Sequence, residues 1–201
     1  MLVAGIKSRP VYGGLDVDQN ARRHLFALEG EGALALIDQA AKAGRDFLMT
    51  SDILYVASGS KAEDHDRKLA ALGPDSLWVA PTIPVLLNRF NVMLGQARMG
   101  TRIYVSGTEG FMGQAMQVAM NHGVDHASIH AEHRGSAARR VQCVHCKGIT
   151  DNVRISPFTC SHCGLSLLVR DHYSRRIGAF QGVCIDAEEP GTVPQPEELF
   201  P

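Results

Sequence analysis

Four cysteines are the residues best suited to chemistry in this chain. Cys143 and Cys146 form one C-x-x-C pair, Cys160 and Cys163 form a second, and thirteen residues separate the pairs. Each pair is expected to form a tight turn that presents two sulfur atoms. Two such turns facing each other give the tetrahedral thiolate set of a structural Zn²⁺ site. The spacing therefore predicts a metal knuckle with zinc as the preferred ion.

Cysteines in such pairs also have uses other than zinc binding. We expect no signal peptide, because the apolar residues 1–6 are few and Lys7 and Arg9 follow at once, so the thiols should stay reduced rather than form disulfides. A redox C-x-x-C normally opens a helix after a strand, and neither pair is placed so. Iron suits four thiolates as well as zinc does and stays open as the alternative. Cys184 lies in an apolar run and is interpreted as a buried small hydrophobe.

Composition restricts the class of protein. The chain has 201 residues, of which 45% are hydrophobic and 20% charged, and its formal net charge is −1. These fractions are typical of globular proteins and not of disordered ones. The near-neutral charge predicts no nucleic-acid partner. Because no apolar run approaches the ~18 residues needed to span a bilayer, we expect a cytoplasmic protein with no membrane contact.

The elements that must position the cysteines fall into two groups. Alternating helical and strand patterns predict an α/β domain at 31–135, with a parallel sheet and flanking helices. Its expected elements are helices at 33–43, 62–72, 82–98 and 111–121 and strands at 53–57, 77–80, 102–106 and 126–130. Residues 136–186 are expected to form a small all-β module of zinc-ribbon or rubredoxin type, with strands at 166–169, 177–180 and 183–185 and a turn at 171–174. Residues 1–30 are an unassigned N-terminal segment, and 187–201 are expected to be a flexible, acidic, proline-rich tail.

A second candidate site is the turn between the strand at 102–106 and the helix at 111–121. The carboxyl end of a parallel strand and the following helix N-terminus are where α/β sheets bind phosphates. Glu109 would repel an anion, and neither a G-x-G-x-x-G nor a Walker motif occurs in the chain. The candidate nucleotide-binding residues are Ser106, Gly107, Thr108, Gly110 and Met112.

Four histidines lie close together near the end of the α/β domain, where a metal cluster is conceivable. His126 and His130 on one strand would lie about 13 Å apart at ~3.3 Å per residue, too far to share an ion. His122, His126, His130 and His133 are therefore expected to be surface or capping residues. No serine, histidine and aspartate pattern typical of a nucleophilic triad stands out either.

Residues 103–112, followed by Gly123-Val124 and residues 129–132, resemble the last part of the nicotinamide-binding module of ferredoxin reductase-type flavoproteins. Ser106 stands where that family has a cysteine near the nicotinamide, and Thr108 replaces its proline. The Arg-x-Tyr-Ser motif of the flavin-binding barrel does not occur. The resemblance implies a nicotinamide-module fold, while these departures lead us to expect that the isolated chain is not catalytic.

The whole chain resembles the DmmA family of dimethylamine monooxygenase subunits. The resemblance covers the reductase-like half, the paired C-x-x-C knuckle and residues 168–185. It implies a multi-subunit enzyme that uses NADPH and O₂ to convert dimethylamine to methylamine and formaldehyde. Flavin, an iron–sulfur cluster and an oxygen-activating iron are then expected on partner subunits.

Two functional hypotheses follow. The first is a structural or assembly subunit of a hetero-oligomeric oxidoreductase, whose zinc knuckle is a docking surface. The second is an electron-transfer component that uses a rubredoxin-type iron or binds a nicotinamide nucleotide. A stand-alone zinc ribbon for nucleic acid is disfavoured by the near-neutral charge. The first hypothesis is preferred because the chain holds no redox centre of its own unless the metal is iron.

Overall fold

The computed structural model describes residues 8–58 and 64–201 and divides the chain into two compact units. The first, here called the α/β unit, is Tyr12–Gly135. The second, the β unit, is Ser136–Pro201 together with the N-terminal stretch that ends at Val11. Each unit has a hydrophobic core of its own.

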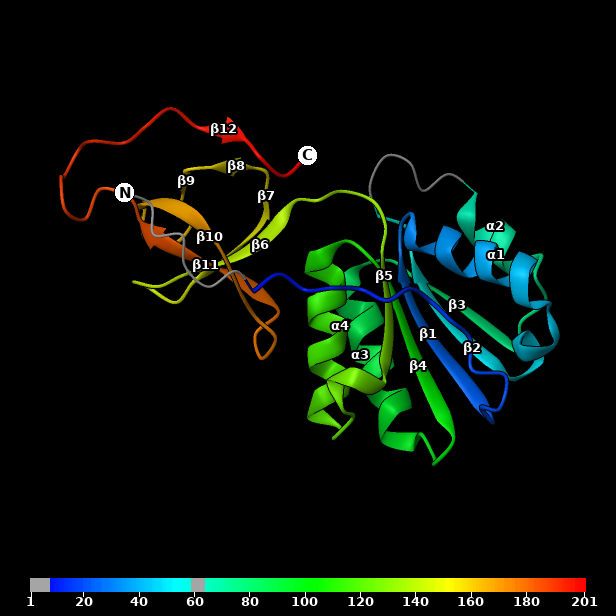
Figure 1. Ribbon diagram of the computed structural model, residues 1–201. Coiled ribbons are helices and arrows are strands. Elements are labelled where there is room, and N and C mark those ends of the chain that lie inside the picture. Colours follow the sequence, from blue (N-terminus) through cyan, green and yellow to red (C-terminus); the bar gives the residue numbers. More distant parts are fainter. Residues whose placement is uncertain (1–7, 59–63) are drawn as a thin grey trace. The chain divides into compact units, whose positions relative to one another are not determined.

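Within the described residues, the α/β unit holds a sheet of five strands that all run parallel (Figure 1). The order across the sheet is β3-β2-β1-β4-β5. The strands are β1 (Arg23–Glu29), β2 (Ser51–Val56), β3 (Ser76–Ala80), β4 (Thr101–Gly107) and β5 (Ile129–His133). Parallel neighbours need crossover connections, which the helices supply. The predicted α/β class with a parallel sheet is confirmed.

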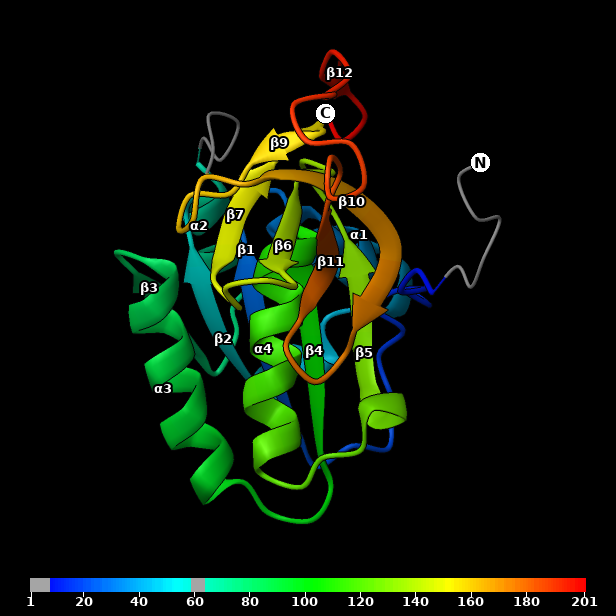
Figure 2. The same cartoon turned by 90° about the vertical axis from the view of Figure 1, so that its left-hand side faces the viewer.

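Helices cover both faces of this sheet, and Figure 2 looks onto one face, with helices in front of the strands and behind them. They are α1 (Gly32–Ala43), α2 (His65–Ala70), α3 (Ile83–Gln96) and α4 (Glu109–Asn121), with short 3₁₀ turns η1 (Asp46–Thr50) and η2 (His126–Ser128). Phe26 and Leu28 of β1 pack with α1, α2 and η1, whereas Leu25 and Ala27 pack with α3 and α4. A sheet buried on both faces needs strands that are apolar at successive positions. Among the described residues, no helix is both long and apolar enough to cross a bilayer.

The middle strand, β1, lies inside the stretch 1–30 that the sequence analysis left unassigned, so the predicted start of the α/β domain at residue 31 is too late. The apolar run of this strand, residues 25–28, is short and lies between two polar residues. His24 and Glu29 are only 1% and 5% exposed. His24 Nδ1 lies 3.2 Å from Tyr104 Oη, and burial lowers the pKa of His24. The polar residues of β1 are thus satisfied inside the protein.

The last strand of the sheet is also displaced from its predicted place. The strand was expected at 126–130, but residues 126–128 form η2 and β5 begins at Ile129. The Asp125 carboxylate accepts a bond from Ala127 N at 3.3 Å and so caps the 3₁₀ turn. The helix predicted at 62–72 is seen as α2 from His65, and its first residues lie outside the described part of the chain.

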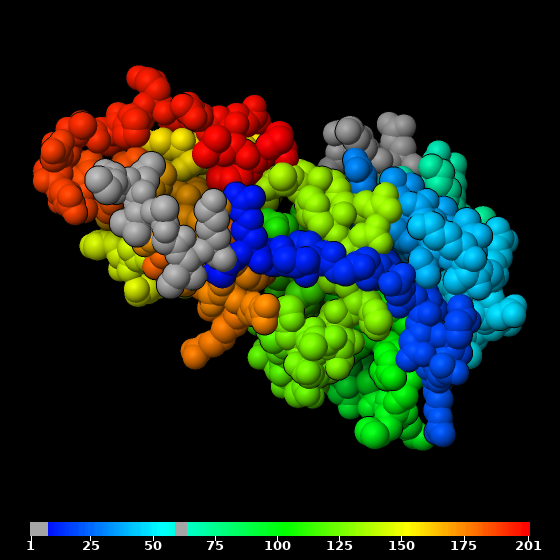
Figure 3. Space-filling model, in the orientation of Figure 1, coloured from blue at the N-terminus to red at the C-terminus, as the bar shows by residue number. Residues whose placement is uncertain are grey.

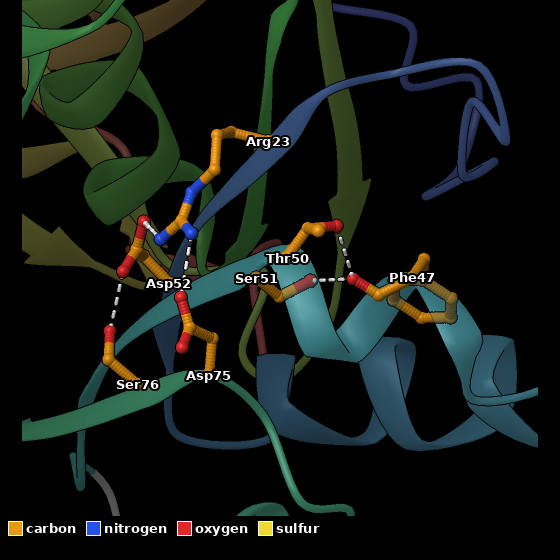
Figure 4. A network of polar contacts seen from close by, with 7 residues as sticks. All are labelled: Arg23, Phe47, Thr50, Ser51, Asp52, Asp75 and Ser76. Carbon is orange, nitrogen blue, oxygen red and sulfur yellow. Dashed lines mark hydrogen bonds and ion pairs between the residues drawn. The ribbon is translucent and has the colours of Figure 1, made fainter.

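Arg23 ties together the amino ends of three strands (Figure 4). Its guanidinium donates to Asp52 of β2 and to Asp75, just before β3, at 2.6 Å in each case. Ser76 Oγ donates to the other oxygen of Asp52, also at 2.6 Å. The network pins the register of β1, β2 and β3 at the end of the sheet opposite the helix N-termini.

The segment before β1 lies along β5, an outer strand of the sheet. Gly14 N donates to Ala131 O at 3.0 Å, and Leu15 N donates to Glu132 Oε2 at 3.1 Å. Leu15 itself is buried. Figure 3 shows this segment in blue, crossing the surface of the α/β unit. It covers part of an edge that would otherwise offer unpaired backbone groups.

The β unit is a small, mixed sheet in the order β7-β6-β11-β10-β9, with β12 paired to β8. Strands β6 and β11 pair in parallel, and the other described pairs are antiparallel. The strands are β6 (Arg139–Cys143), β7 (Ile149–Val153), β8 (Ile155–Ser156), β9 (Phe158–Thr159), β10 (Ser166–Ser174), β11 (Ala179–Cys184) and β12 (Glu197–Glu198). The predicted all-β region that carries the cysteines is confirmed.

Strand β10 is longer than predicted. It runs through 171–174, where a turn was expected, and the reversal falls at 175–178 instead. A register shift before Tyr173 marks a bulge. Ser8 lies alongside: its amide donates to Asp171 O at 2.9 Å, and its carbonyl accepts from Tyr173 N at 3.0 Å. This pairing keeps the residues of the supposed turn extended.

The tail at 187–201 is held more closely than expected. Arg139, 6% exposed, is sandwiched between the rings of Phe180 and Phe200, each 4.0 Å from the guanidinium carbon. The same guanidinium is ion-paired with Asp171 at 2.9 Å. Phe200 is only 8% exposed. A single buried cation thus anchors the end of a segment whose composition predicted flexibility.

Candidate metal centre

The two C-x-x-C pairs meet in the β unit. The sulfur atoms of Cys143, Cys146, Cys160 and Cys163 all lie within 4.8 Å of one another. The separation is 3.9 Å between the sulfurs of Cys143 and Cys163 and 3.8 Å between those of Cys146 and Cys160. Across residues 8–58 and 64–201, this is the one group of histidine, cysteine and acidic side chains arranged to hold a metal ion.

These separations fit a four-coordinate ion. A Zn–S bond of about 2.3 Å places the sulfurs of a regular tetrahedron about 3.8 Å apart. A disulfide would bring two sulfurs to about 2.05 Å, and all four cysteines are free thiols. Four sulfurs with no oxygen or nitrogen ligand suit zinc or iron. The residues present therefore fit either ion.

The first knuckle follows strand β6. Cys143, the last residue of β6, donates its amide to Gly148 O at 2.9 Å, and its carbonyl accepts from Lys147 N at 3.0 Å. Gly148 N then donates to Cys146 Sγ at 3.4 Å. Lys147 has a φ of 64°, the left-handed conformation that turns the chain back. The turn thus points the N–H group of Gly148 at the sulfur atom of Cys146.

The second knuckle repeats this pattern. Cys160 N donates to Leu165 O at 2.9 Å, and Gly164 N donates to Cys160 O at 3.0 Å. Gly164 has a φ of 75°, matching Lys147 in the first knuckle. The Leu165 amide donates to the Cys163 sulfur as Gly148 does to Cys146. Two turns with one hydrogen-bond scheme therefore face each other.

Side chains also fasten the second knuckle to β7. His162 Nε2 donates to Ile149 O at 2.8 Å, and the hydroxyls of Ser161 and Thr150 lie 2.9 Å apart. A Cβ added at Gly148 would collide with the His162 ring, so these parts pack without a gap. No motif in the sequence predicts these contacts. The middle residues of each C-x-x-C pair, Val-His and Ser-His, gave the only signal.

The thiols differ in how readily they ionise. Burial raises the pKa of Cys160, but hydrogen bonds from the Cys163 and His162 amides, and from neighbouring thiols, outweigh it and lower that pKa to about 6. The Leu165 amide lowers the pKa of Cys163, yet burial and the three neighbouring thiols raise it to about 12. One thiolate thus forms easily, and further thiolates repel one another. A cation bound among the sulfurs removes that repulsion.

The five candidate nucleotide residues lie where predicted, at the end of β4 and the start of α4. Ser106 is fully buried and donates its hydroxyl to Glu132 O at 2.7 Å. Thr108 caps α4, its Oγ1 accepting from Phe111 N at 3.4 Å. Met112 belongs to the core. Gly107 and Gly110 contribute backbone to the turn.

A residue that the sequence analysis missed occupies this turn. Both the amide and the hydroxyl of Thr108 donate to the Glu29 carboxylate. The signal available was an acidic residue at the end of a strand, followed by Gly-Glu-Gly. The candidate phosphate position therefore has a side-chain ligand.

The histidines play separate structural parts. His122 follows α4, and its Nε2 lies 2.8 Å from Asn91 Oδ1. His130 stacks on Tyr104 with ring centroids 5.0 Å apart. His126 belongs to η2 rather than to a strand. Within the described residues, no metal-ligand group includes any of them.

Comparison with known proteins gives the family. The chain matches "Dimethylamine monooxygenase subunit DmmA-like, N-terminal domain" over residues 4–129. It matches the corresponding C-terminal domain over residues 140–183. The chain belongs to the DmmA-like family. The C-terminal match spans both cysteine pairs, so the cluster lies within the part shared with the family.

One relative of this DmmA-like chain is a protein of Ectopseudomonas mendocina (strain ymp). It is described as a heme-dependent oxidative N-demethylase delta subunit and is 32% identical over 151 residues. The matched region covers 73% of this chain and 86% of that protein. The likeness therefore extends over most of both chains.

Two solved structures share a more distant likeness with the DmmA-like chain. An intact type IV self-sufficient cytochrome P450 monooxygenase is 18% identical with a TM-score of 0.43, covering 85% of this chain and 27% of that one. The flavohem-like FAD/NAD binding domain of nitric oxide dioxygenase from Vibrio cholerae O1 biovar El Tor is 19% identical with a TM-score of 0.41. That match covers 63% of this chain and 56% of the domain. Likeness at this level assigns no function.

Proposed function

We propose that this chain is an assembly subunit of a multi-subunit oxidative N-demethylase. Its DmmA-like family and the description of its relative as a demethylase subunit support this assignment. The assembly would use NADPH and O₂ to convert dimethylamine to methylamine and formaldehyde. Partner subunits would carry the flavin, the iron–sulfur cluster and the oxygen-activating iron, for which the relative's description suggests heme.

The role of this chain would be structural, and a zinc ion would fix its β unit. The observation that carries this proposal is the pair of matched knuckles, whose four sulfurs are spaced as a tetrahedral Zn²⁺ site requires. Zn²⁺ has no redox chemistry and would supply a cross-link between two turns. Such a link suits a small sheet whose own core is modest.

The four cysteines would each hold one corner of that cross-link. Cys143 and Cys146 would bind from the end of β6, and Cys160 and Cys163 from the turn before β10. The Gly148 and Leu165 amides would stabilise the thiolates of Cys146 and Cys163. The face beside the knuckles would then keep one shape for docking to partner subunits.

Elemental analysis and assembly together test this proposal. The full chain, purified without added metal, should contain about one zinc per molecule and show no visible absorbance. Co-expressed with its partner subunits, it should co-purify with them, whereas Cys160→Ser should be lost from the complex while the partners keep their cofactors. A complex that retains the metal-free variant would contradict the assembly role.

Iron in the same site is the second candidate, and one observation favours it. Cys146 is exposed and Cys163 half-buried, so two sulfurs lie near the surface where an electron could pass to a partner. The chain would then be an electron-transfer component. About one iron per chain with visible thiolate-to-iron absorption would establish this role and exclude the zinc proposal.

A further inference from the structure

The sheet order places a ligand-binding position between β1 and β4. From β1 the chain proceeds outward through β2 and β3 on one side, and from β4 it proceeds to β5 on the other. Open α/β sheets bind ligands at the carboxyl ends of two such neighbouring strands. A nucleotide there places its phosphates on free amides at a helix N-terminus. The reductase-like fold therefore implies a nicotinamide nucleotide at this point.

The Glu29 carboxylate already fills this position. Oε2 accepts from Thr108 N at 2.9 Å and from Thr108 Oγ1 at 2.7 Å. Oε1 accepts from Ser58 Oγ at 2.6 Å. Glu29 is the last residue of β1, Thr108 precedes α4, and Ser58 follows β2. One side chain thus joins the ends of three strands, and it takes the amide donor that a phosphate would need.

Among the described residues, the chain packs closely around this position. A Cβ at Gly107 would lie 2.8 Å from Glu29 Cβ and 2.9 Å from its Oε2, so the turn is closed against this side chain. A Cβ at Gly32, the first residue of α1, would collide with Ser106 O. The first turn of α1 therefore packs directly on the end of β4. The missing side chains are thus used for contacts within the protein: Gly107 lets the Glu29 side chain approach, and Gly32 lets the backbone of Ser106 approach.

The charges around this position also disfavour the binding of an anion. Glu31 is the N-cap residue of α1, and Glu109 lies in the first turn of α4. Together with Glu29, they put a carboxylate at each helix N-terminus where an anion would bind. Arg134, whose amide donates to Gly107 O, is already ion-paired with Glu132 at 2.6 Å. A phosphate would therefore meet carboxylates at both helix N-termini.

We propose that Glu29 is an internal ligand of the anion position and that the α/β unit does not bind nicotinamide nucleotide between β1 and β4. Entry of a phosphate would break three hydrogen bonds to a buried carboxylate and bring two anions together. The residues at this point do not fit the cofactor that the fold implies. This inference goes beyond the proposed assembly role and does not depend on which metal the cysteines hold.

The first test measures nucleotide binding by the full-length wild-type chain. Isothermal titration calorimetry with NADPH and with NADP⁺ should show no saturable heat up to about 1 mM ligand. Metal content, measured on the same sample, reports separately on the cysteine site. Saturable NADPH binding below that concentration, abolished by a bulky substitution such as Gly107→Val, would overturn the proposal.

The second test removes the internal ligand and replaces it with a free anion. Glu29→Ala should lower the melting temperature by about 5–10 °C because it strands the Thr108 and Ser58 donors. Acetate, which replaces the missing carboxylate, should restore several degrees relative to chloride at equal ionic strength. Glu31→Ala removes a carboxylate that makes no side-chain capping bond, so it should show neither the loss nor the rescue.

The outcomes of the second test are distinct. Specific rescue of Glu29→Ala by acetate supports an anion position occupied by Glu29. A loss of stability with equal response to acetate and chloride would mean that Glu29 merely packs, and it would overturn the proposal. Where Glu29→Ala does not fold, Glu29→Gln keeps the shape of the side chain, and its NADPH titration decides the question.

Discussion

Cys160 shows at the scale of one residue what the cluster requires. Its sulfur is buried and lies 3.8 Å from that of Cys146 on the other knuckle. The Cys160 amide and carbonyl also close its own turn. Loss of this one sulfur would therefore remove a ligand and leave three thiols around a polar gap.

Cys160→Ser is expected to abolish metal binding. A serine hydroxyl is a poor ligand for zinc, and three sulfurs hold the ion weakly. Metal content measured by mass spectrometry should fall from about one ion per chain to below about 0.2. Cys184→Ser is the matched control, because Cys184 lies outside the cluster and a serine can donate to Asp186 as the thiol does at 3.2 Å. Full metal content in both variants would disprove the site.

Asp171 gives the β unit a dependence on pH. Hydrogen bonds from Arg9 and Arg139, with the charge of both guanidinium groups, hold its pKa below the ordinary value of 3.8 despite partial burial. A lowered pKa contributes stability that is complete above about pH 4 and is lost as the pH falls through the folded value. The ion pairs of Asp171 should therefore stabilise the β unit at neutral pH and not in acid.

Asp171→Asn should destabilise the β unit by about 1–3 kcal/mol at pH 7 and by much less at pH 2. Urea unfolding, followed by a probe within residues 136–201, measures the difference between wild type and variant at each pH. Both proteins lose metal in acid, so that loss cancels in the comparison. A gap that stays constant from pH 7 to pH 2 would contradict the ion-pair origin of the effect.

The two knuckles are the turns that bring the sulfur atoms of each C-x-x-C pair together. Each needs one residue with left-handed backbone, Lys147 in the first and Gly164 in the second. A glycine after a C-x-x-C pair indicates such a conformation from the sequence, whereas a lysine gives no signal for a positive φ. The hydrogen-bond scheme rather than the residue type is what the two turns share.

Gly164→Ala should cost about 1 kcal/mol through backbone strain alone. Nothing lies within 4 Å of a Cβ at this position, so no clash adds to the strain. Chemical unfolding and a zinc-competition titration should both report the loss. Gly13→Ala, with equal space and no positive φ, should change stability by less than about 0.5 kcal/mol. Equal effects of the two changes would refute the strain argument.

Most elements of the α/β unit could be predicted because their residues follow one rule. Strands β2 and β4 are apolar at successive positions, as a doubly covered sheet requires. Strand β1 follows the rule at residues 25–28, but this run is flanked by His24 and Glu29, whose partners lie in β4 and in the turn after it, far along the chain. Partners brought together only by the tertiary fold leave no local pattern.

The β unit was harder to predict for a similar reason. A turn was expected at 171–174, but pairing with Ser8, more than 160 positions earlier, keeps that stretch in β10. The tail looked too polar to order itself, and Phe200 nevertheless packs on Arg139. In both cases contacts between distant residues outweigh local composition.

The candidate sites differ in how far the sequence reveals them. Four cysteines in two pairs predict their own convergence, because thiolates at this spacing have few other uses in a reduced chain. The nucleotide candidates rest on a strand, a glycine and a helix start, and these features also fit a turn that binds no ligand. The position of Glu29 distinguishes a nucleotide site from a turn that binds no ligand. That position could not be predicted, because β1 was not expected as a strand.

At the scale of the whole chain, metal removal should act on one unit only. All four cysteines belong to the β unit, so a chelator should loosen the amides that close the knuckles, such as those of Cys143 and Cys160. Hydrogen–deuterium exchange should rise by at least tenfold in peptides from 139–165. Peptides covering β1 and β4 should keep their protection. A uniform rise along the chain would show that the metal supports both units.

The parallel pairing of β6 with β11 has a consequence for biogenesis. The strand that ends in Cys143 lies beside a strand that ends at Cys184, with Cys143 opposite Gly182. During translation, the first thiol pair leaves the ribosome some forty residues before its neighbouring strand exists. All four cysteines of the cluster are also made before β11, so the metal could bind before β6 gains its parallel neighbour, and the α/β unit is complete earlier still.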